Sequence, residues 1–161
     1  MSELRIGLGL DLHRVGERGD DGVLVLGGVH FPGEPTLIGH SDADAVAHAI
    51  ADAMLGAAGL GDLGSHFPDT DEQWRGADSL TILRACRSLV GAAHWRLVNA
   101  DCTLLCERPR ISPVRLEMME KLSAAAGGPV HVKATRPEGI GAFGRMEGIA
   151  CHAVALLERE S

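Results

Sequence analysis

Leu4-Arg-Ile-Gly-Leu-Gly-Leu-Asp-Leu-His13 alternates strictly between two sets of residues. Leucine and isoleucine occupy the even positions, whereas Gly7, Gly9, Asp11 and His13 share the odd ones. Because successive side chains of a strand point to opposite faces, the pattern predicts a strand with Asp11 and His13 on one face. Gly7 and Gly9 on that face leave room for a ligand or another backbone to approach closely.

A helix with a second histidine is predicted after this strand. Its apolar positions recur at helical spacing and comprise Ala43, Val46, Ala47, Ile50, Met54, Leu55 and Ala58. Ser41, three residues before Asp44, resembles a capping box that starts the helix. His48 lies off the apolar stripe, on a face that it shares with Asp44 and Asp52.

Asp11, His13 and His48 together offer one carboxylate and two imidazoles, a ligand set that suits Zn²⁺. Three protein ligands leave the fourth tetrahedral position open, which is typical of catalytic rather than structural zinc. The alternative is that both histidines are ordinary surface or core residues and that Asp11 only caps a turn. Spacing alone does not show that the strand and the helix converge.

The remaining patterns predict an α+β fold with one sheet covered on one face by helices. Strands at 23–26 and 29–31 flank Gly27-Gly28, a two-residue turn suited to a hairpin. A long functional loop is expected over 59–76, a helix from Asp78, and a third helix from Ser112-Pro113 to Gly127. Further strands are predicted at 95–106, 130–135 and 148–157, and residues 1–161 are read as a single domain.

Composition excludes several classes of function. The formal net charge is −7 and no lysine and arginine cluster resembles the footprint of a nucleic-acid binder. Neither a charged-then-apolar leader nor an apolar run of about 18 residues occurs, so we expect a cytoplasmic protein without a membrane span. The four cysteines show no paired C-x-x-C spacing and are expected to be reduced core residues.

Two loops carry further polar residues with more than one interpretation. His40 and Ser41 precede the predicted N-terminus of a helix, where free N–H groups and the helix dipole suit a phosphate. Ser41 is equally explained as a cap, and His40 as a loop histidine. Asp62, Asp69 and Asp71 could bind sugar-like hydroxyls, bind a second cation or end turns.

A third group follows the later strands. Lys133 and Thr135 share a strand face and lead into Arg136-Pro-Glu138 and a glycine-rich loop that ends at Arg145. Cations, a hydroxyl and a carboxylate suit a phosphate chain with Mg²⁺, although a solvated glycine turn explains them as well. Glu107-Arg-Pro-Arg110 is either an ordinary exit loop or a segment whose backbone groups read a base edge.

Together these segments resemble the 2-C-methyl-D-erythritol 2,4-cyclodiphosphate synthases of the non-mevalonate route to isoprenoids. The resemblance covers nearly the whole chain and rests on 6–14, 26–29, Gly39-His-Ser-Asp-Ala-Asp44 with His48, Leu60-Gly-Asp-Leu-Gly64, Phe67-Pro-Asp-Thr-Asp71, Gly76-Ala-Asp-Ser79 and Gly148-Ile-Ala-Cys151. It implies a homotrimer with active sites between adjacent subunits. Each subunit would have a ferredoxin-like four-stranded sheet with helices on its outer face.

The resemblance also implies a reaction. The substrate, 4-diphosphocytidyl-2-C-methyl-D-erythritol 2-phosphate, cyclises when its 2-phosphate attacks the β-phosphorus and expels CMP. One zinc ion per site would be held by Asp11, His13 and His48, and Asp11 and His13 would also line the substrate site. Glu138 would coordinate Mg²⁺ or Mn²⁺ between the α- and β-phosphates. His40 and Ser41 would contact phosphate oxygens, with His40 stabilising the transition state.

The implied substrate subsites come from four segments. The methylerythritol subsite would be formed by Asp62, Leu63 and Gly64 and bordered by Phe67, Pro68, Asp69, Thr70 and Asp71. The cytidine pocket, from the neighbouring subunit, would consist of Cys106, Glu107, Arg108, Pro109, Arg110, Ile111 and Ser112. The diphosphate would be covered by Thr135, Arg136, Pro137 and Glu138. Ala142 and Arg145 would complete the site, with Arg145 at its edge near the trimer axis.

One loop departs from the family pattern. Where the family usually has Lys-Ala-Thr-Thr-Thr-Glu, this chain has Lys133-Ala-Thr-Arg-Pro-Glu138, so Arg136 occupies the position of a stabilising threonine. Arginine can neutralise phosphate charge but is longer, and Pro137 removes a backbone donor. Ala142 stands where an aromatic residue is common, with Phe143 next to it. The alternatives are a non-catalytic homologue that binds zinc and a cytidine nucleotide, and a structural metalloprotein with a fourth protein ligand.

Overall fold

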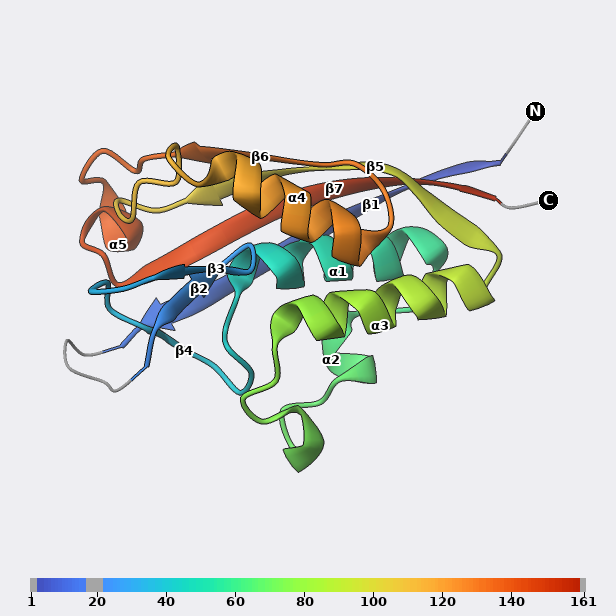
Figure 1. Ribbon diagram of the computed structural model, residues 1–161, viewed down its shortest axis with the longest axis horizontal. Coiled ribbons are helices and arrows are strands. Elements are labelled where there is room, and N and C mark those ends of the chain that lie inside the picture. Colours follow the sequence, from blue (N-terminus) through green and yellow to red (C-terminus); the bar gives the residue numbers. More distant parts are fainter. Residues whose placement is uncertain (1–2, 17–21, 160–161) are drawn as a thin grey trace.

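The computed structural model describes residues 3–16 and 22–159, which form the layered α+β arrangement of Figure 1. In chain order the elements are β1 (Leu4–Val15), β2 (Leu24–Leu26), β3 (Val29–Phe31), β4 (Leu37–Ile38), α1 (Ala45–Ala58), α2 (Leu63–His66), η1 (Glu72–Trp74), α3 (Ser79–Ala92), β5 (Trp95–Leu105), α4 (Arg115–Ala126), β6 (Val130–Thr135), α5 (Gly141–Gly144) and β7 (Gly148–Arg159). The main sheet has the order β4-β1-β7-β5-β6, with β5 and β6 parallel and the other pairs antiparallel. Helix α1 packs on β1 and β7, α4 packs on β6, and α3 packs on both helices.

Within the described residues the main sheet has five strands, so the expected count of four is wrong. The additional strand, β4, is two residues long and pairs with the end of β1 through Arg14–Ile38 and Val15–Leu37. A two-residue strand is too short to show alternation, which explains why the sequence pattern did not predict it. The predicted 59–76 loop likewise contains two short helices, α2 and η1.

The glycine face of β1 packs directly against the backbone of α1. A Cβ atom added to Gly7 would lie 1.9 Å from the carbonyl oxygen of Ala53, and one added to Gly9 would lie 1.9 Å from that of Ala49. The expectation that these glycines admit a close backbone approach is therefore confirmed. Because Asp11 and His13 continue the same face, the strand directs them toward α1.

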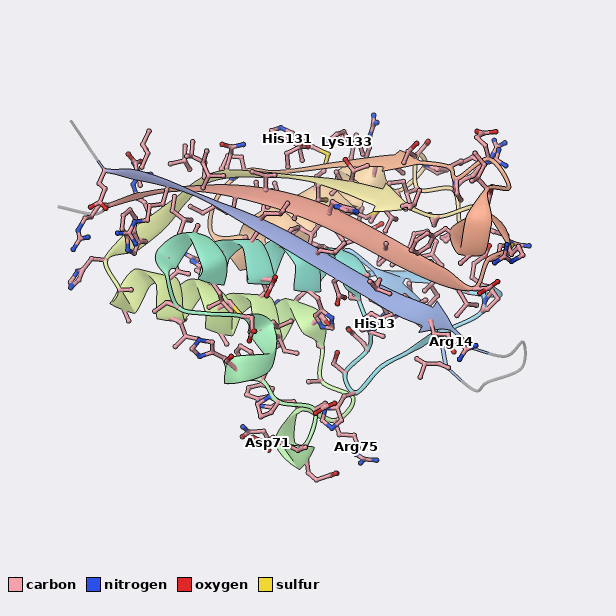
Figure 2. The ribbon with its side chains drawn as sticks, turned by 180° about the vertical axis from the view of Figure 1, so that it is seen from behind. His13, Arg14, Asp71, Arg75, His131 and Lys133 are labelled. Atoms are coloured by element: carbon pink, nitrogen blue, oxygen red, sulfur yellow. The ribbon has the colours of Figure 1, made fainter. Side chains whose placement is uncertain are left out.

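The large side chains of β1 lie on the opposite face, which the described helices leave open. Ile6 is 74% exposed and Leu8 is 69% exposed, although both are apolar. Figure 2 views the molecule from this side, with β1 and β7 in front of the helices. We call this surface the apolar sheet face, and its exposed members are Leu4, Ile6, Leu8, Leu10, Leu12 and Val154.

A buried carboxylate joins the hairpin to α1. Asp44 accepts hydrogen bonds from the backbone N–H groups of Gly27 at 2.8 Å and Gly28 at 2.7 Å, and from those of Val46 and Ala47 at 3.1 Å each. The predicted Gly27-Gly28 hairpin turn is confirmed, with φ angles of 59° and 73° that suit a turn requiring positive φ at both positions. Asp44 thus caps α1 and closes the turn at once.

Two predicted helix starts are wrong. Asp44 is the N-cap of α1, so Ser41 does not start that helix. The third helix begins at Arg115 after Val114, which makes no side-chain capping bond, and Ser112-Pro113 lies in the preceding turn. In both cases a capping-type residue stands a few positions early, and the backbone continues as a turn before the helix begins. Gly127 does end α4, with a φ of 80°.

The structure shows the state of the cysteines and the length of the helices. All four cysteines are buried and unpaired, as predicted for reduced core residues. None of the helices in the described ranges has the length and hydrophobicity that a membrane crossing requires.

Gly9→Ala tests the close packing of β1 on α1. Because its Cβ would overlap the Ala49 carbonyl, we expect the free energy of unfolding to fall by about 2 kcal/mol, within the usual range for overpacking. Gly56→Ala is the matched control, since nothing lies within 4 Å of its added Cβ; it should stabilise α1 by about 0.5–1 kcal/mol. Urea denaturation of the two variants gives the comparison, and equal stabilities would contradict the packing argument.

Candidate metal centre

Asp11 and His13 of β1 meet His48 of α1 where the strand passes over the helix. Asp11 Oδ2 lies 3.0 Å from His13 Nε2 and 3.3 Å from His48 Nδ1, and the two ring nitrogens are 3.3 Å apart. A zinc ion bound tetrahedrally at about 2.0–2.1 Å places its ligand atoms about 3.3 Å from one another. The structure thus brings the three predicted ligands from strand and helix together, and their spacing fits zinc.

The charges of the group also suit a cation. Asp11 Oδ2 is buried and, despite its short distances to both rings, makes no hydrogen bond of acceptable geometry. Burial opposes ionisation of Asp11, but the His13 and His48 rings hold the pKa of its carboxyl below its usual value. Burial likewise lowers the pKa of His48, yet Asp11 raises it above the ordinary histidine value overall. A buried oxygen without a hydrogen bond, facing two ring nitrogens, is a donor set that a divalent cation completes.

The three side chains open into a pocket of about 540 Å³, comparable to sites that hold small organic ligands. Several residues predicted for the substrate site line it beside the metal ligands, namely His40, Ser41, Leu63, Gly64, Phe67, Pro68 and Asp69. A metal held by these three side chains would face this pocket, so a ligand in the pocket would reach its open coordination position. This arrangement differs from a closed structural site, because among the described residues the group has three members rather than four.

Three other predicted substrate residues do not line the pocket. Asp62 caps α2 by accepting from the Ser65 N–H at 2.8 Å, and Asp71 caps η1 by accepting from the Gln73 N–H at 3.1 Å. The Ser65 hydrogen bonds lower the pKa of Asp62. Thr70 lies exposed between the pocket and η1. Turn formation, one of the interpretations that the sequence left open, accounts for the positions of both aspartates.

The phosphate role expected of a helix N-terminus beside His40 and Ser41 is not supported. Helix α1 begins four residues after Ser41, and Asp44 already accepts from its first N–H groups. His40 itself lines the pocket, and its Nε2 atom is buried without a hydrogen-bond partner. The histidine, rather than the helix end, is therefore the group available to a ligand.

Sequence reasoning missed two contributions to this site. Trp74 lines the pocket, edge-on to Phe67 with ring centroids 4.9 Å apart, and its Nε1 atom is buried without a partner. Trp74 lies in a segment without a periodic pattern, so the sequence did not indicate that it lines the pocket. Ser79 contacts the outer ring nitrogen of His48 at 2.8 Å. The Gly76–Ser79 motif was visible, but a contact over 31 residues cannot be read from spacing.

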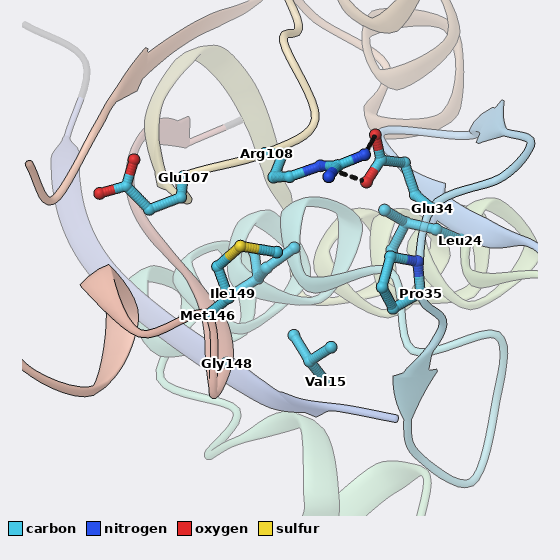
Figure 3. Close-up of a pocket in the computed structure, with 9 residues that line it drawn as sticks. All are labelled: Val15, Leu24, Glu34, Pro35, Glu107, Arg108, Met146, Gly148 and Ile149. Carbon is cyan, nitrogen blue, oxygen red and sulfur yellow. Dashed lines mark hydrogen bonds and ion pairs between the residues drawn. The ribbon is translucent and has the colours of Figure 1, made fainter. Parts of the chain in front are cut away.

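The remaining predicted residues form a second group away from the metal pocket. Although residues 106–112 and 135–145 are all described, none lines that pocket. Glu107 accepts from Arg136 at 3.0 Å and from the Gly139 N–H at 2.6 Å, and these bonds lower the pKa of Glu107. Arg108 forms a two-bond ion pair with Glu34 across a small pocket (Figure 3).

Glu138 and Arg145 complete this second group. Glu138 is exposed, with a φ of 53°, and Arg145 pairs with Glu147 at 2.6 Å. The structure therefore divides the predicted site residues of one chain into two separate sets. The metal ligands belong to one set, and the predicted cytidine and diphosphate contacts belong to the other.

Comparison with known proteins gives consistent matches. Residues 4–158 match the YgbB family. A 2-C-methyl-D-erythritol 2,4-cyclodiphosphate synthase from Rubrobacter xylanophilus is 52% identical over 162 residues, which cover 99% of this chain and 98% of that protein. The bifunctional IspDF from Campylobacter jejuni superposes with a TM-score of 0.92 at 33% identity, over 99% of this chain and 43% of that one. A CDP complex of IspF from Plasmodium falciparum gives 0.84 at 29% identity, over 100% and 99% of the two chains.

His48→Ala tests the metal centre. Removing one of three ligands should weaken zinc binding by more than about 100-fold, because loss of an outer contact alone typically costs 10–100-fold. The measurement is competition with a chromogenic chelator, with circular dichroism as a check that the variant is folded. His30→Ala, an exposed histidine on β3, is the control and should bind zinc normally. Zinc affinity that is unchanged in His48→Ala would refute the assignment.

Proposed function

This chain belongs to the YgbB family, and we propose that it is a 2-C-methyl-D-erythritol 2,4-cyclodiphosphate synthase of the non-mevalonate isoprenoid route. The observation that carries the proposal is the Asp11, His13 and His48 group, which opens into a pocket large enough for a small phosphorylated sugar alcohol. The synthase from Rubrobacter xylanophilus matches this chain along almost the whole length of both proteins, so the similarity is not limited to one part of either chain.

In the proposed reaction an oxygen of the substrate 2-phosphate attacks the β-phosphorus of the diphosphate. A new P–O–P link forms, the bond between the β-phosphorus and the bridging oxygen to the α-phosphorus breaks, and CMP leaves with that oxygen. Both reacting groups belong to one molecule, so the protein mainly has to hold it in an in-line geometry. A bound divalent cation supplies charge neutralisation at the phosphate oxygens.

The residues of the metal pocket receive the following roles. Asp11, His13 and His48 hold zinc, and His40 donates from its unpartnered Nε2 to a phosphate oxygen as charge develops there. Ser41 lies beside the same group and contacts a second phosphate oxygen. Leu63, Gly64 and the segment from Phe67 to Asp69 surround the methylerythritol carbon chain. Asp62, at the cap of α2, and Thr70 and Asp71 lie outside this lining.

The second group of residues would bind the nucleotide end of the substrate. We assign residues 106–112 to the cytidine, Thr135–Glu138 to the diphosphate, and Ala142 and Arg145 to the edge of the site. Glu138 would hold Mg²⁺ or Mn²⁺, which its exposed carboxylate allows. Because this group lies away from the metal pocket of its own chain, a complete site requires the second group of another copy.

A homotrimer satisfies this requirement and also covers the apolar sheet face. An exposed apolar surface of this kind on one sheet is typical of an interface between subunits. With that face turned inward, the helices lie outside, and the two groups of neighbouring copies can meet at each junction. We propose that residues 1–161 act as one ferredoxin-like domain of such a trimer.

The alternative function is that of a non-catalytic homologue that binds zinc and a cytidine nucleotide. Arg136 favours this alternative, because it stands where the family usually has a threonine. In the structure Arg136 forms an ion pair with Glu107, so it adds no uncompensated charge to the loop. The named relatives are synthases, and the non-catalytic reading is not favoured.

Phosphorus NMR tests the activity. The purified protein is incubated with the diphosphocytidyl methylerythritol phosphate, Zn²⁺ and Mg²⁺, beside a chelator-treated control. We expect the substrate resonances to be replaced by those of CMP and a cyclic diphosphate only when metal is present. Unchanged substrate together with saturable binding would instead establish the non-catalytic reading and locate the defect in Thr135–Glu138.

Ile6→Asp tests the trimer. A charge at the centre of the apolar sheet face should prevent association, so light scattering after size-exclusion chromatography should give one chain mass where the unmodified protein gives three. Leu116→Asp is the matched control, because Leu116 on α4 is 76% exposed and Ile6 is 74% exposed. Dissociation by both variants, or by neither, would contradict the proposed interface.

A further inference from the structure

We infer that Ser79 and Asp42 act as a positioning pair that fixes which nitrogen of His48 binds the metal. The inference rests on the proposed zinc site and goes beyond its three ligands. Ser79 is the first residue of α3 and is only 1% exposed, and Asp42 lies in the loop before α1. Neither residue contacts the pocket surface, so any effect on the metal acts through His48.

The contacts form a continuous chain. His48 Nε2 lies 2.8 Å from Ser79 Oγ, which in turn donates to a carboxylate oxygen of Asp42. The second Asp42 oxygen accepts from the Ser79 N–H at 3.0 Å, so the carboxylate holds both the backbone and the side chain of Ser79. Asp42 is itself held in place, because its own N–H donates to the Ala77 carbonyl at 3.1 Å.

The proton positions follow from the chemistry of these groups. A serine hydroxyl has a single proton, and here the Asp42 carboxylate, which can only accept, takes it. Ser79 Oγ must therefore accept from His48, which places a proton on Nε2. The other ring nitrogen, Nδ1, is then left with its lone pair directed at the metal position beside Asp11. The pair thus selects the tautomer that can bind zinc.

The Ser79 hydroxyl is not needed to cap α3. The cap of α3 is Asp78, whose side chain accepts from the Leu80 N–H at 2.9 Å. Ser41 Oγ also lies near His48 Nε2, but at 3.2 Å, and its other hydrogen bond among the described residues comes from the Ala43 N–H at 3.3 Å. Ser79 is accordingly the partner that fixes the ring, and Ser41 remains available to the pocket.

The first test is zinc affinity measured by chelator competition. Ser79→Ala should weaken binding about 10–100-fold, the usual loss for an outer contact of a metal-bound histidine. Ser88→Ala is the control, because it removes an exposed hydroxyl from the same helix and should leave affinity unchanged. If Asp42 acts through Ser79, Asp42→Asn should cost little further affinity in the Ser79→Ala background. Full affinity in Ser79→Ala, or additive losses, would overturn the inference.

A second measurement uses the unmodified protein and does not depend on a variant folding. In the zinc-loaded, ¹⁵N-labelled protein we expect the His48 ring to show a protonated, slowly exchanging Nε2 and a coordinated Nδ1. A freely exchanging Nε2 proton, or coordination through Nε2, would overturn the inference. If the unmodified protein binds no zinc at all, the zinc site itself fails, and the inference falls with it. Normal zinc binding with a freely exchanging Nε2 proton refutes the positioning pair alone.

Discussion

The buried carboxylate of Asp44 fixes the start of α1, the helix that carries His48. It accepts four backbone N–H groups, two from the hairpin turn and two from the first turn of α1. Burial raises the pKa of this carboxyl, and the N–H groups oppose that effect by favouring its charged form. Because hairpin and helix share one carboxylate, α1 cannot shift relative to the β2–β3 hairpin without leaving several buried N–H groups unpaired. His48 lies one turn after Asp44, so its position follows directly.

The glycines on the inner face of β1 affect both the distance between β1 and α1 and the outer face of the sheet. Gly7 and Gly9 bring the strand close enough to α1 for side chains of different elements to share one metal. Close approach leaves no room for large side chains on that face, and the strand carries them on the other one. The residues that shorten the distance to α1 therefore also create the apolar sheet face. Metal binding and association between copies are, on the proposed function, two results of one alternating pattern.

The sequence could predict those features that depend on local periodicity. The alternation of residues 4–13 placed Asp11 and His13 on one face, and two adjacent glycines identified the hairpin. It could not choose between Ser41 and Asp44 as the cap of α1, because both are capping residues and the choice depends on the distant hairpin N–H groups that Asp44 also accepts. The contact of Ser79 with His48 and the position of Trp74 over the pocket depend on packing between elements, which leaves no local pattern.

Arg136 shows how a departure from a family pattern can be compatible with the same chemistry. Its guanidinium is held by Glu107, and the same carboxylate also accepts from the Gly139 N–H, so the loop on either side of Glu138 is tied to the end of β5. The Arg136 side chain is exposed, whereas the Glu107 carboxylate is mostly covered and also accepts from the Gly139 N–H, so it keeps one partner if Arg136 binds another oxyanion. A diphosphate, like a carboxylate, offers two oxygens to which one guanidinium can donate two hydrogen bonds. On the proposed function, Arg136 exchanges the Glu107 carboxylate for the diphosphate when the substrate binds, and in the empty protein the ion pair with Glu107 holds it in the loop.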